Sequence, residues 1–187
     1  MAADSGLIGT TRWRTLAYQN GAFWAGLLHN WKPNYEGQPW LMFLSYSFLH
    51  GGITHLLGNM FALAILAHNV VGRVGNWLFL LIYFGSAIGG AVVFGLLTSS
   101  PQPMVGASGA LSGLAGAWLY WEWRDRRDLG LRLVPVWLTL LALVILNVIL
   151  WLALDGLLAW ETHLGGAIAG CAIAAILQRW YRPSSTS

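Results

Sequence analysis

The chain has 187 residues, of which 57% are hydrophobic and only 9% are Asp, Glu, Lys or Arg. Its mean hydropathy of +0.59 lies far above that of a soluble domain of this length, which excludes an ordinary soluble hydrolase and predicts a protein whose main solvent is lipid. The formal net charge of +3 does not indicate nucleic-acid binding, because the basic residues lie between apolar segments and form no continuous stripe.

The first 47 residues are more polar than the rest of the chain. They show no continuous apolar core of the kind found in a secretory signal peptide. Residues 15–31 are uncharged, but they contain several Asn, Gln and His and are barely long enough to cross a bilayer. We therefore favour an interfacial or membrane-dipping segment here over a first span. Residues 31–40, rich in Pro, Gly and Asn between tryptophans, predict a loop at the membrane interface.

Five apolar segments follow, and each predicts one transmembrane helix. Residues 74–121 hold no charged residue and no histidine, and since one span needs roughly 20 residues, this stretch holds two. The expected spans are residues 48–71, 76–97, 105–122, 133–154 and 162–180. The fold class is therefore an all-α polytopic membrane protein with a single domain over residues 1–187. In that domain, residues 48–180 form the transmembrane core and residues 181–187 form a cytoplasmic tail.

The basic residues predict the orientation of these spans. Seven of the ten Lys and Arg fall in connections on one side of the bundle: Arg73, Arg124, Arg126, Arg127, Arg132, Arg179 and Arg182. The opposite connections, residues 98–104 and 155–161, hold none. By the positive-inside bias, we expect the basic side and the C-terminus to face the cytoplasm, in the cytoplasmic (inner) membrane of a bacterium.

Polar side chains gather near the other, outer side. His50, His55 and Asn59 lie in HGGITHLLGNM, Ser108 lies in GASGALSGLAG, and His163 lies in THLGGAIAG. A polar side chain within a span usually faces the bundle interior and has a partner or a function. The three helices all start on the outer side, so these side chains lie within a few residues of one level, and one pocket is expected to collect them.

A serine and a histidine at one level predict nucleophilic catalysis. A serine hydroxyl needs a base to take its proton, and a neutral imidazole suits that task near neutral pH. Ser108 is the expected nucleophile and His163 the expected base, with packing to orient the ring because no acidic residue is near. His55, Asn59 and backbone N–H groups at the start of the Ser108 helix, beside Gly106, are candidate donors to an oxyanion.

Small residues predict that the Ser108 and His163 helices touch. Gly109 and Gly113 form one GxxxG pair and Gly166 and Gly170 another, and such pairs allow close backbone approach in lipid.

Each motif also has an ordinary interpretation. Small residues such as those of GASG are common at helix contacts, and a histidine near a span end often serves only the interface. Interface or packing roles are also expected for the polar residues His29, His68 and Asn147, and packing for the single cysteine, Cys171. Only the three motifs together, in this order and on the same side, favour catalysis.

The three motifs together resemble those of the rhomboid family of intramembrane proteases. HGGITHLLGN is similar to its second-helix His and Asn motif, GASGALSGLAG to its GxSG nucleophile motif, and THLGGAIAG to its last-helix HxxGxxxG. The resemblance covers roughly residues 40–180. It implies a six-helix core and a Ser108 and His163 dyad in a cavity open to the outer side, with no metal and no cofactor. It also implies His55 and Asn59 as oxyanion donors and His50 as a residue that shapes the same region.

The resemblance implies partners as well. The expected substrates are single-span membrane proteins cleaved in or near their transmembrane segments, the expected surroundings are a lipid bilayer, and no nucleic acid is expected. The alternative is a catalytically silent rhomboid-like protein that binds transmembrane helices. A small transporter or channel is disfavoured, because the inner halves of the spans are nearly free of polar residues.

The sequence departs from the family pattern at three places. The family's first helix is not evident ahead of Trp31, and we expect it to be missing or degenerate. Position 112, often an aromatic residue that stacks on the catalytic ring in the family, is Ser112, so other neighbours are expected to orient His163. The family's Trp-Arg pair of the first loop has only a partial counterpart in Trp13 and Arg14.

Overall fold

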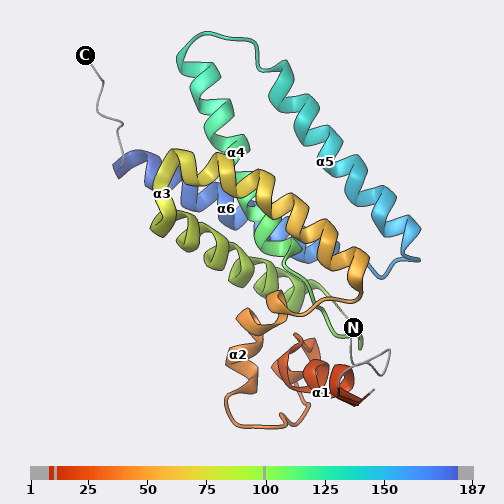
Figure 1. The fold of residues 1–187 in the computed structure, drawn as a ribbon. Helices are drawn as coiled ribbons and strands as arrows, with labels where there is room; N and C mark the ends of the chain where they lie inside the picture. Colours follow the sequence, from red (N-terminus) through yellow and green to blue (C-terminus); the bar gives the residue numbers. More distant parts are fainter. Residues whose placement is uncertain (1–8, 11, 99, 181–187) are drawn as a thin grey trace.

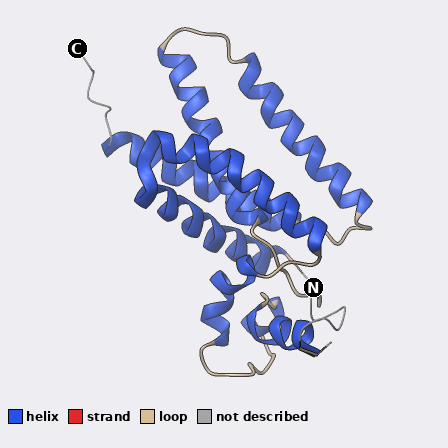
Figure 2. Cartoon of the chain, viewed as in Figure 1, coloured by secondary structure: helices blue, strands red, loops and turns tan. Residues whose placement is uncertain are grey.

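The computed structural model describes residues 9–10, 12–98 and 100–180, and the chain in these ranges is helical without a named strand (Figures 1 and 2). The predicted tail, residues 181–187, lies outside the described residues. The helices in chain order are α1 (Arg12–Gly21), α2 (Gln38–Ser45), α3 (Ile53–Leu97), α4 (Ser108–Asp128), α5 (Val134–Ala153) and α6 (Trp160–Trp180), with 3₁₀ turns η1 (Ala25–Leu28) and η2 (Tyr46–Phe48).

Helix α3 consists of two arms joined by a sharp bend at Gly75. Gly75 has φ 77° and ψ 174°, a conformation that a glycine adopts without a steric penalty. The two arms run antiparallel beside each other (Figure 1), and they correspond to the predicted spans 48–71 and 76–97. The first arm begins only at Ile53, so the predicted start at residue 48 was too early and His50 lies in a loop.

Helix α4 is the centre of the bundle and packs against both α3 and α6. Among the described helices, three are long and apolar enough to cross a membrane: Ile53–Leu97, Val134–Ala153 and Trp160–Arg179. Helix α4 is not one of these, because its second half carries several charged residues and its first half is rich in small ones. It buries Leu111, Leu114 and Trp121 against its neighbours instead.

Glycines bring α4 and α6 together. A Cβ built on Gly166 would overlap the carbonyl oxygen of Gly109, and one built on Gly170 would overlap that of Gly113. The predicted close approach of the two glycine pairs is therefore confirmed, and it brings the first turns of both helices together.

Helix α5 stands apart from the other helices (Figure 1). Val136 is its only buried residue among those described, and most of its leucines, isoleucines and valines are exposed. Such an apolar surface is expected where a helix faces lipid or an apolar ligand.

The N-terminal segment caps one end of the bundle. Residues 15–31 form the end of α1 and the short turn η1 in place of one span-length helix, which supports the interfacial interpretation. Phe23 and Met104 exchange two backbone hydrogen bonds, of 3.0 and 2.9 Å, so the segment is fastened to the loop that precedes α4.

At the opposite end, basic residues make specific contacts. The Arg73 guanidinium donates to both carboxylate oxygens of Asp125, at 2.6 and 2.9 Å, and lies 5.1 Å from the Trp121 ring centroid. These hydrogen bonds hold the pKa of the Asp125 carboxyl below its usual range. The bend of α3 and the last turns of α4 are therefore tied together.

Candidate active site

Ser108 and His163 meet where α4 and α6 begin. Ser108 is the first residue of α4, and His163 lies in the first turn of α6. The distance between His163 Nε2 and Ser108 Oγ is 2.8 Å, which is within the normal range of a hydrogen bond. Because the glycines press the two helices together just beyond these positions, the pair is held by backbone packing and does not depend on long, flexible side chains.

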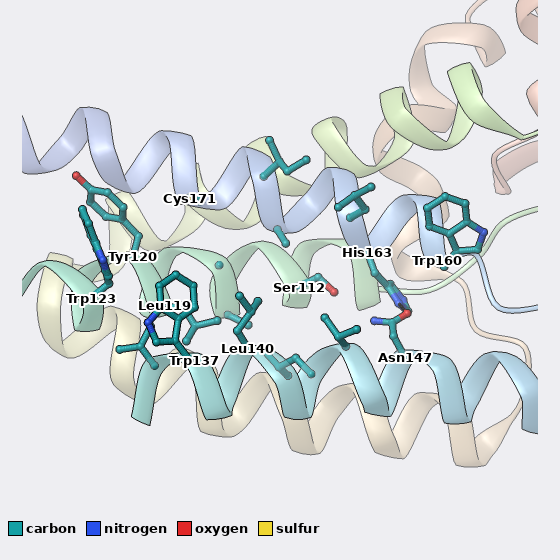
Figure 3. Close-up of a pocket in the computed structure, with 18 of the residues that line it drawn as sticks. Ser112, Leu119, Tyr120, Trp123, Trp137, Leu140, Asn147, Trp160, His163 and Cys171 are labelled. Atoms are coloured by element: carbon teal, nitrogen blue, oxygen red, sulfur yellow. Dashed lines mark hydrogen bonds between the residues drawn. The ribbon is translucent and has the colours of Figure 1, made fainter. Parts of the chain in front are cut away.

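The other ring nitrogen of His163 faces helix α5. His163 Nδ1 lies 2.9 Å from Asn147 Oδ1, and Figure 3 shows the two side chains pointing toward each other. A carbonyl oxygen can only accept, so Nδ1 carries the hydrogen and donates a hydrogen bond to Asn147 Oδ1. In a neutral ring, Nε2 then has a free lone pair, which accepts the hydroxyl hydrogen of Ser108. The contact selects the tautomer that a general base requires.

Gly106 places the ring of His55 next to the nucleophile. Its φ of +126° is rare for any residue with a side chain, and a Cβ there would lie 2.7 Å from His55 Cε1 and 3.8 Å from Asn59 Nδ2. His55 Nδ1 accepts a hydrogen bond from the Gly51 N–H at 3.3 Å, so in the neutral ring Nε2 carries the hydrogen. That N–H lies beside Gly106, two residues before Ser108.

Asn59 is buried one helical turn after His55. Its Nδ2 donates to the His55 carbonyl oxygen at 3.0 Å, which uses one of its two amide hydrogens. The amide nitrogen is also the nearest atom of this residue to Gly106. His55 and Asn59 therefore present donors from one face of α3 toward the start of α4.

His50 supports the loop that precedes α3. Its ring centroid lies 5.3 Å from that of His55, and its carbonyl oxygen accepts a hydrogen bond from the Tyr18 hydroxyl at 2.9 Å. Arg14 donates to the next carbonyl oxygen, that of Gly51, at 2.7 Å. Burial lowers the pKa of the His50 imidazole. The lowered pKa favours the neutral form of the His50 ring, which lies beside His55.

Tyr46 is a supporting residue that the sequence did not indicate. Its carbonyl oxygen accepts from the Gly106 N–H at 3.0 Å, and its hydroxyl donates to the Ala87 carbonyl oxygen at 2.8 Å. The side chain is fully buried. Tyr46 thus connects the loop before α4 to the second arm of α3, and only the folded chain brings these three segments together.

A cavity of about 1090 Å³ lies between α4, α5 and α6 and reaches His163 (Figure 3). Ser112, Asn147 and His163 supply polar atoms at one end, and the rest of the lining is mainly apolar, including Trp137 and Leu140. An apolar chain or helix therefore has room beside the histidine.

All six predicted site residues lie at the same end of the bundle: Ser108, His163, His55, Asn59, Gly106 and His50. The described residues contain no group of three His, Cys, Asp or Glu side chains that could share a metal ion. The sequence predicts only an interface or packing role for Asn147. The signal that could have identified it is a single amide within an otherwise apolar span, which normally requires a partner.

Comparisons with known proteins agree with these motifs. A family model described as the Rhomboid domain matches residues 36–180. The chain is 34% identical over 138 residues to "Rhomboid protease GluP" of Bacillus subtilis (strain 168), across 74% of this chain and 26% of that protein. It is 28% identical over 143 residues to "Rhomboid-type serine protease 2" of Emericella nidulans, across 75% of this chain and 27% of that protein.

A plant relative matches over a similar length. The chain is 31% identical over 151 residues to "RHOMBOID-like protein 6, mitochondrial" of Arabidopsis thaliana, across 79% of this chain and 47% of that protein. The chain thus spans about a quarter of the length of the first two relatives and about half of the third.

Proposed function

The chain belongs to the rhomboid family of integral membrane proteins, and from that premise we propose that it is a serine endopeptidase that cleaves membrane proteins within the bilayer. Ser108 is the nucleophile and His163 is the general base in this proposal. The observation that carries it is the 2.8 Å contact between Ser108 Oγ and His163 Nε2, at a position where both residues begin glycine-packed helices.

In the first half of the reaction, His163 Nε2 takes the hydroxyl proton as Ser108 Oγ attacks the carbonyl carbon of the scissile peptide bond. The tetrahedral intermediate collapses when the C–N bond breaks and the protonated ring gives its proton to the leaving amine. An acyl ester on Ser108 remains. In the second half, the ring takes a proton from water, the hydroxide adds to the ester carbonyl, and the proton returns to Ser108 as the acid leaves.

The negative charge of the intermediate needs donors at the start of α4. Ala107 is the N-cap of α4 and has no side chain that could cap the first N–H groups. Those N–H groups, at the positive end of the helix dipole, and the side chains of His55 and Asn59 all border the Gly106 turn. We assign them as the oxyanion site, with His50 supporting the ring of His55.

The expected substrates are single-span membrane proteins. The cavity beside His163 supports this class, because its mainly apolar lining suits an apolar transmembrane segment that enters from the lipid. The basic residues near the bend of α3 and between α4 and α5 further support an orientation in which that end and the C-terminus face the cytoplasm of a bacterium. The active site then opens to the outer side.

Labelling of the nucleophile tests the proposal without knowledge of the substrate. Purified protein in detergent is treated with a fluorescent fluorophosphonate, and the modified residue is identified by mass spectrometry. We expect one label on Ser108, which Ser108→Ala removes. The matched control is Ser86→Ala, since Ser86 is buried and its hydroxyl has no partner among the described residues. A folded protein that takes no label, with cleavage of a single-span substrate equally absent, favours the catalytically silent alternative.

A further inference from the structure

Helix α5 carries an amide in the middle of an apolar surface. Its two polar side chains in the described helix are Thr139 and Asn147, and Thr139 Oγ1 donates to the Pro135 carbonyl oxygen of its own helix. Asn147 instead reaches another helix, where Oδ1 lies 2.9 Å from His163 Nδ1. A buried or lipid-facing amide is costly unless it is hydrogen-bonded, so this contact explains why the side chain is tolerated there.

We propose that Asn147 is a positioning residue for His163, so that the site works as Ser108, His163 and Asn147 in sequence. This inference rests on the proposed function, because it assigns how the general base of that reaction is held. Asn147 does not touch the reacting atoms, and it acts through the imidazole.

The geometry gives the amide two effects. In the resting enzyme, Oδ1 accepts the hydrogen of Nδ1 and so keeps the lone pair of Nε2 directed at Ser108. When the ring takes the proton of the serine, it becomes a cation whose Nδ1–H donates to the same oxygen more strongly. An asparagine is known to hold the histidine in cysteine proteases of the papain type, so a neutral amide is sufficient for this role.

The small side chain at position 112 agrees with this arrangement. Ser112 borders the same cavity as His163 and Asn147. It offers no aromatic face on which the imidazole could stack, so stacking at this position cannot fix the ring. The hydrogen bond that His163 donates to Asn147 on α5 provides this constraint instead.

The position of α5 therefore determines how the His163 ring is oriented. The bond between Asn147 and His163 is the only side-chain hydrogen bond that the described residues place between α5 and another helix. Because α5 is otherwise loosely packed, its movement toward lipid would release Nδ1 and leave the ring free to rotate.

The test compares wild type, Asn147→Ala and Asn147→Asp, with Asn69→Ala as the matched control. Asn69 also lies on a long apolar helix, but its amide bonds only the Ile65 carbonyl oxygen of its own helix. The rate of fluorophosphonate labelling at Ser108 is measured against pH, and kcat and KM are measured for a single-span substrate. Loss of a hydrogen bond to a charged ring predicts a fall of about 10- to 100-fold in labelling rate and kcat for Asn147→Ala, with KM unchanged.

The aspartate variant separates positioning from a structural role. Its carboxylate keeps the acceptor at Nδ1 and favours the protonated ring, so activity should be largely restored and the acidic limb of the pH–rate profile should move to higher pH. A residue that only holds α5 in place would change KM or thermal stability and leave that limb unmoved. Labelling of Asn147→Ala at the rate of Asn69→Ala, or a loss confined to KM, overturns the inference.

A spectroscopic readout keeps the two proposals distinguishable. In protein labelled with ¹⁵N-histidine, His163 is assigned by its absence from His163→Gln. We expect Nδ1 to be the protonated nitrogen in wild type, and Asn147→Ala to populate the Nε2–H tautomer. If the fluorophosphonate does not modify Ser108 in wild type, the proposed function fails. The ¹⁵N spectrum still reports on the hydrogen bond between His163 and Asn147. A His163 tautomer that is the same in Asn147→Ala as in wild type overturns the positioning role.

Discussion

His163 Nε2 lies 2.8 Å from Ser108 Oγ, and this contact between residues 55 positions apart in sequence joins the first turns of α4 and α6. It is a direct consequence of the glycine contact between α4 and α6, because a wider separation of the two backbones would place the ring out of reach. One arrangement therefore includes the proposed nucleophile, the proposed oxyanion site and the helix packing. A different substitution tests each of these parts.

Removal of the base should abolish the reactivity of the nucleophile. His163→Ala leaves no proton acceptor beside Ser108, so we expect the labelling rate and peptide-bond cleavage to fall by about 10³-fold or more. Tryptophan fluorescence and the thermal unfolding midpoint should stay close to those of wild type. His68→Ala is the control, because His68 is exposed on α3. Labelling of His163→Ala at the wild-type rate would exclude His163 as the base.

Removal of an oxyanion donor should slow the reaction without stopping it. Asn59→Ala deletes one of several donors near the Gly106 turn, and the loss of one such donor is expected to reduce kcat by about 10²-fold. Substrate binding should change little, because the donor acts mainly on the charge that forms during the reaction. Equal kcat values for Asn59→Ala and Asn69→Ala would remove Asn59 from the oxyanion site.

Gly106 should tolerate no side chain. Gly106→Ala would have to keep a φ of +126° and would place a methyl group 2.7 Å from His55 Cε1, so we expect loss of labelling together with a lower thermal stability. The same substitution at Gly72 is the control, because a Cβ there meets nothing within 4 Å. If Gly106→Ala behaves like Gly72→Ala, the turn before α4 is not a rigid element.

The glycine contact between α4 and α6 should affect stability and activity together. Gly170→Ala forces a methyl group onto the Gly113 carbonyl oxygen, and overpacking of this kind typically costs about 1 to 3 kcal/mol. Because the helices must separate, the labelling rate at Ser108 should fall as well. Gly58→Ala serves as the control, since open space surrounds that position. A stable Gly170→Ala protein with wild-type labelling would contradict the link between packing and catalysis.

The ion pair between Arg73 and Asp125 predicts a dependence of stability on pH. Since the pKa of Asp125 is lowered in the folded protein, the pair stabilises the fold fully above the unfolded pKa of the carboxyl. That contribution is lost as the pH falls through the folded pKa. We expect Asp125→Asn to unfold at a lower temperature than wild type at pH 7 and at a similar temperature in strong acid. A difference that persists unchanged in acid would rule out the ion pair as its source.

Helix α5 shows where sequence patterns are insufficient. The sequence predicts a span at residues 133–154, and the helix found there is Val134–Ala153. The apolar composition that predicts the helix is nearly uniform around it, so it does not indicate which face meets the bundle. The contact of Asn147 with His163 therefore could not be derived, although a lone amide in an apolar span is itself a signal that a partner exists.

Hydropathy, charge and short motifs were sufficient to predict a membrane-embedded helical bundle with Ser108, His163, His55 and Asn59 at one level, because each of these signals is local in the chain. The catalytic roles of these residues stay predictions. Only the tertiary structure decided the loop position of His50, the support from Tyr46 and the hydrogen bond that His163 donates to Asn147. The physical reason is that these contacts depend on how far helices are rotated and how closely their backbones approach, and both are set by packing between distant segments.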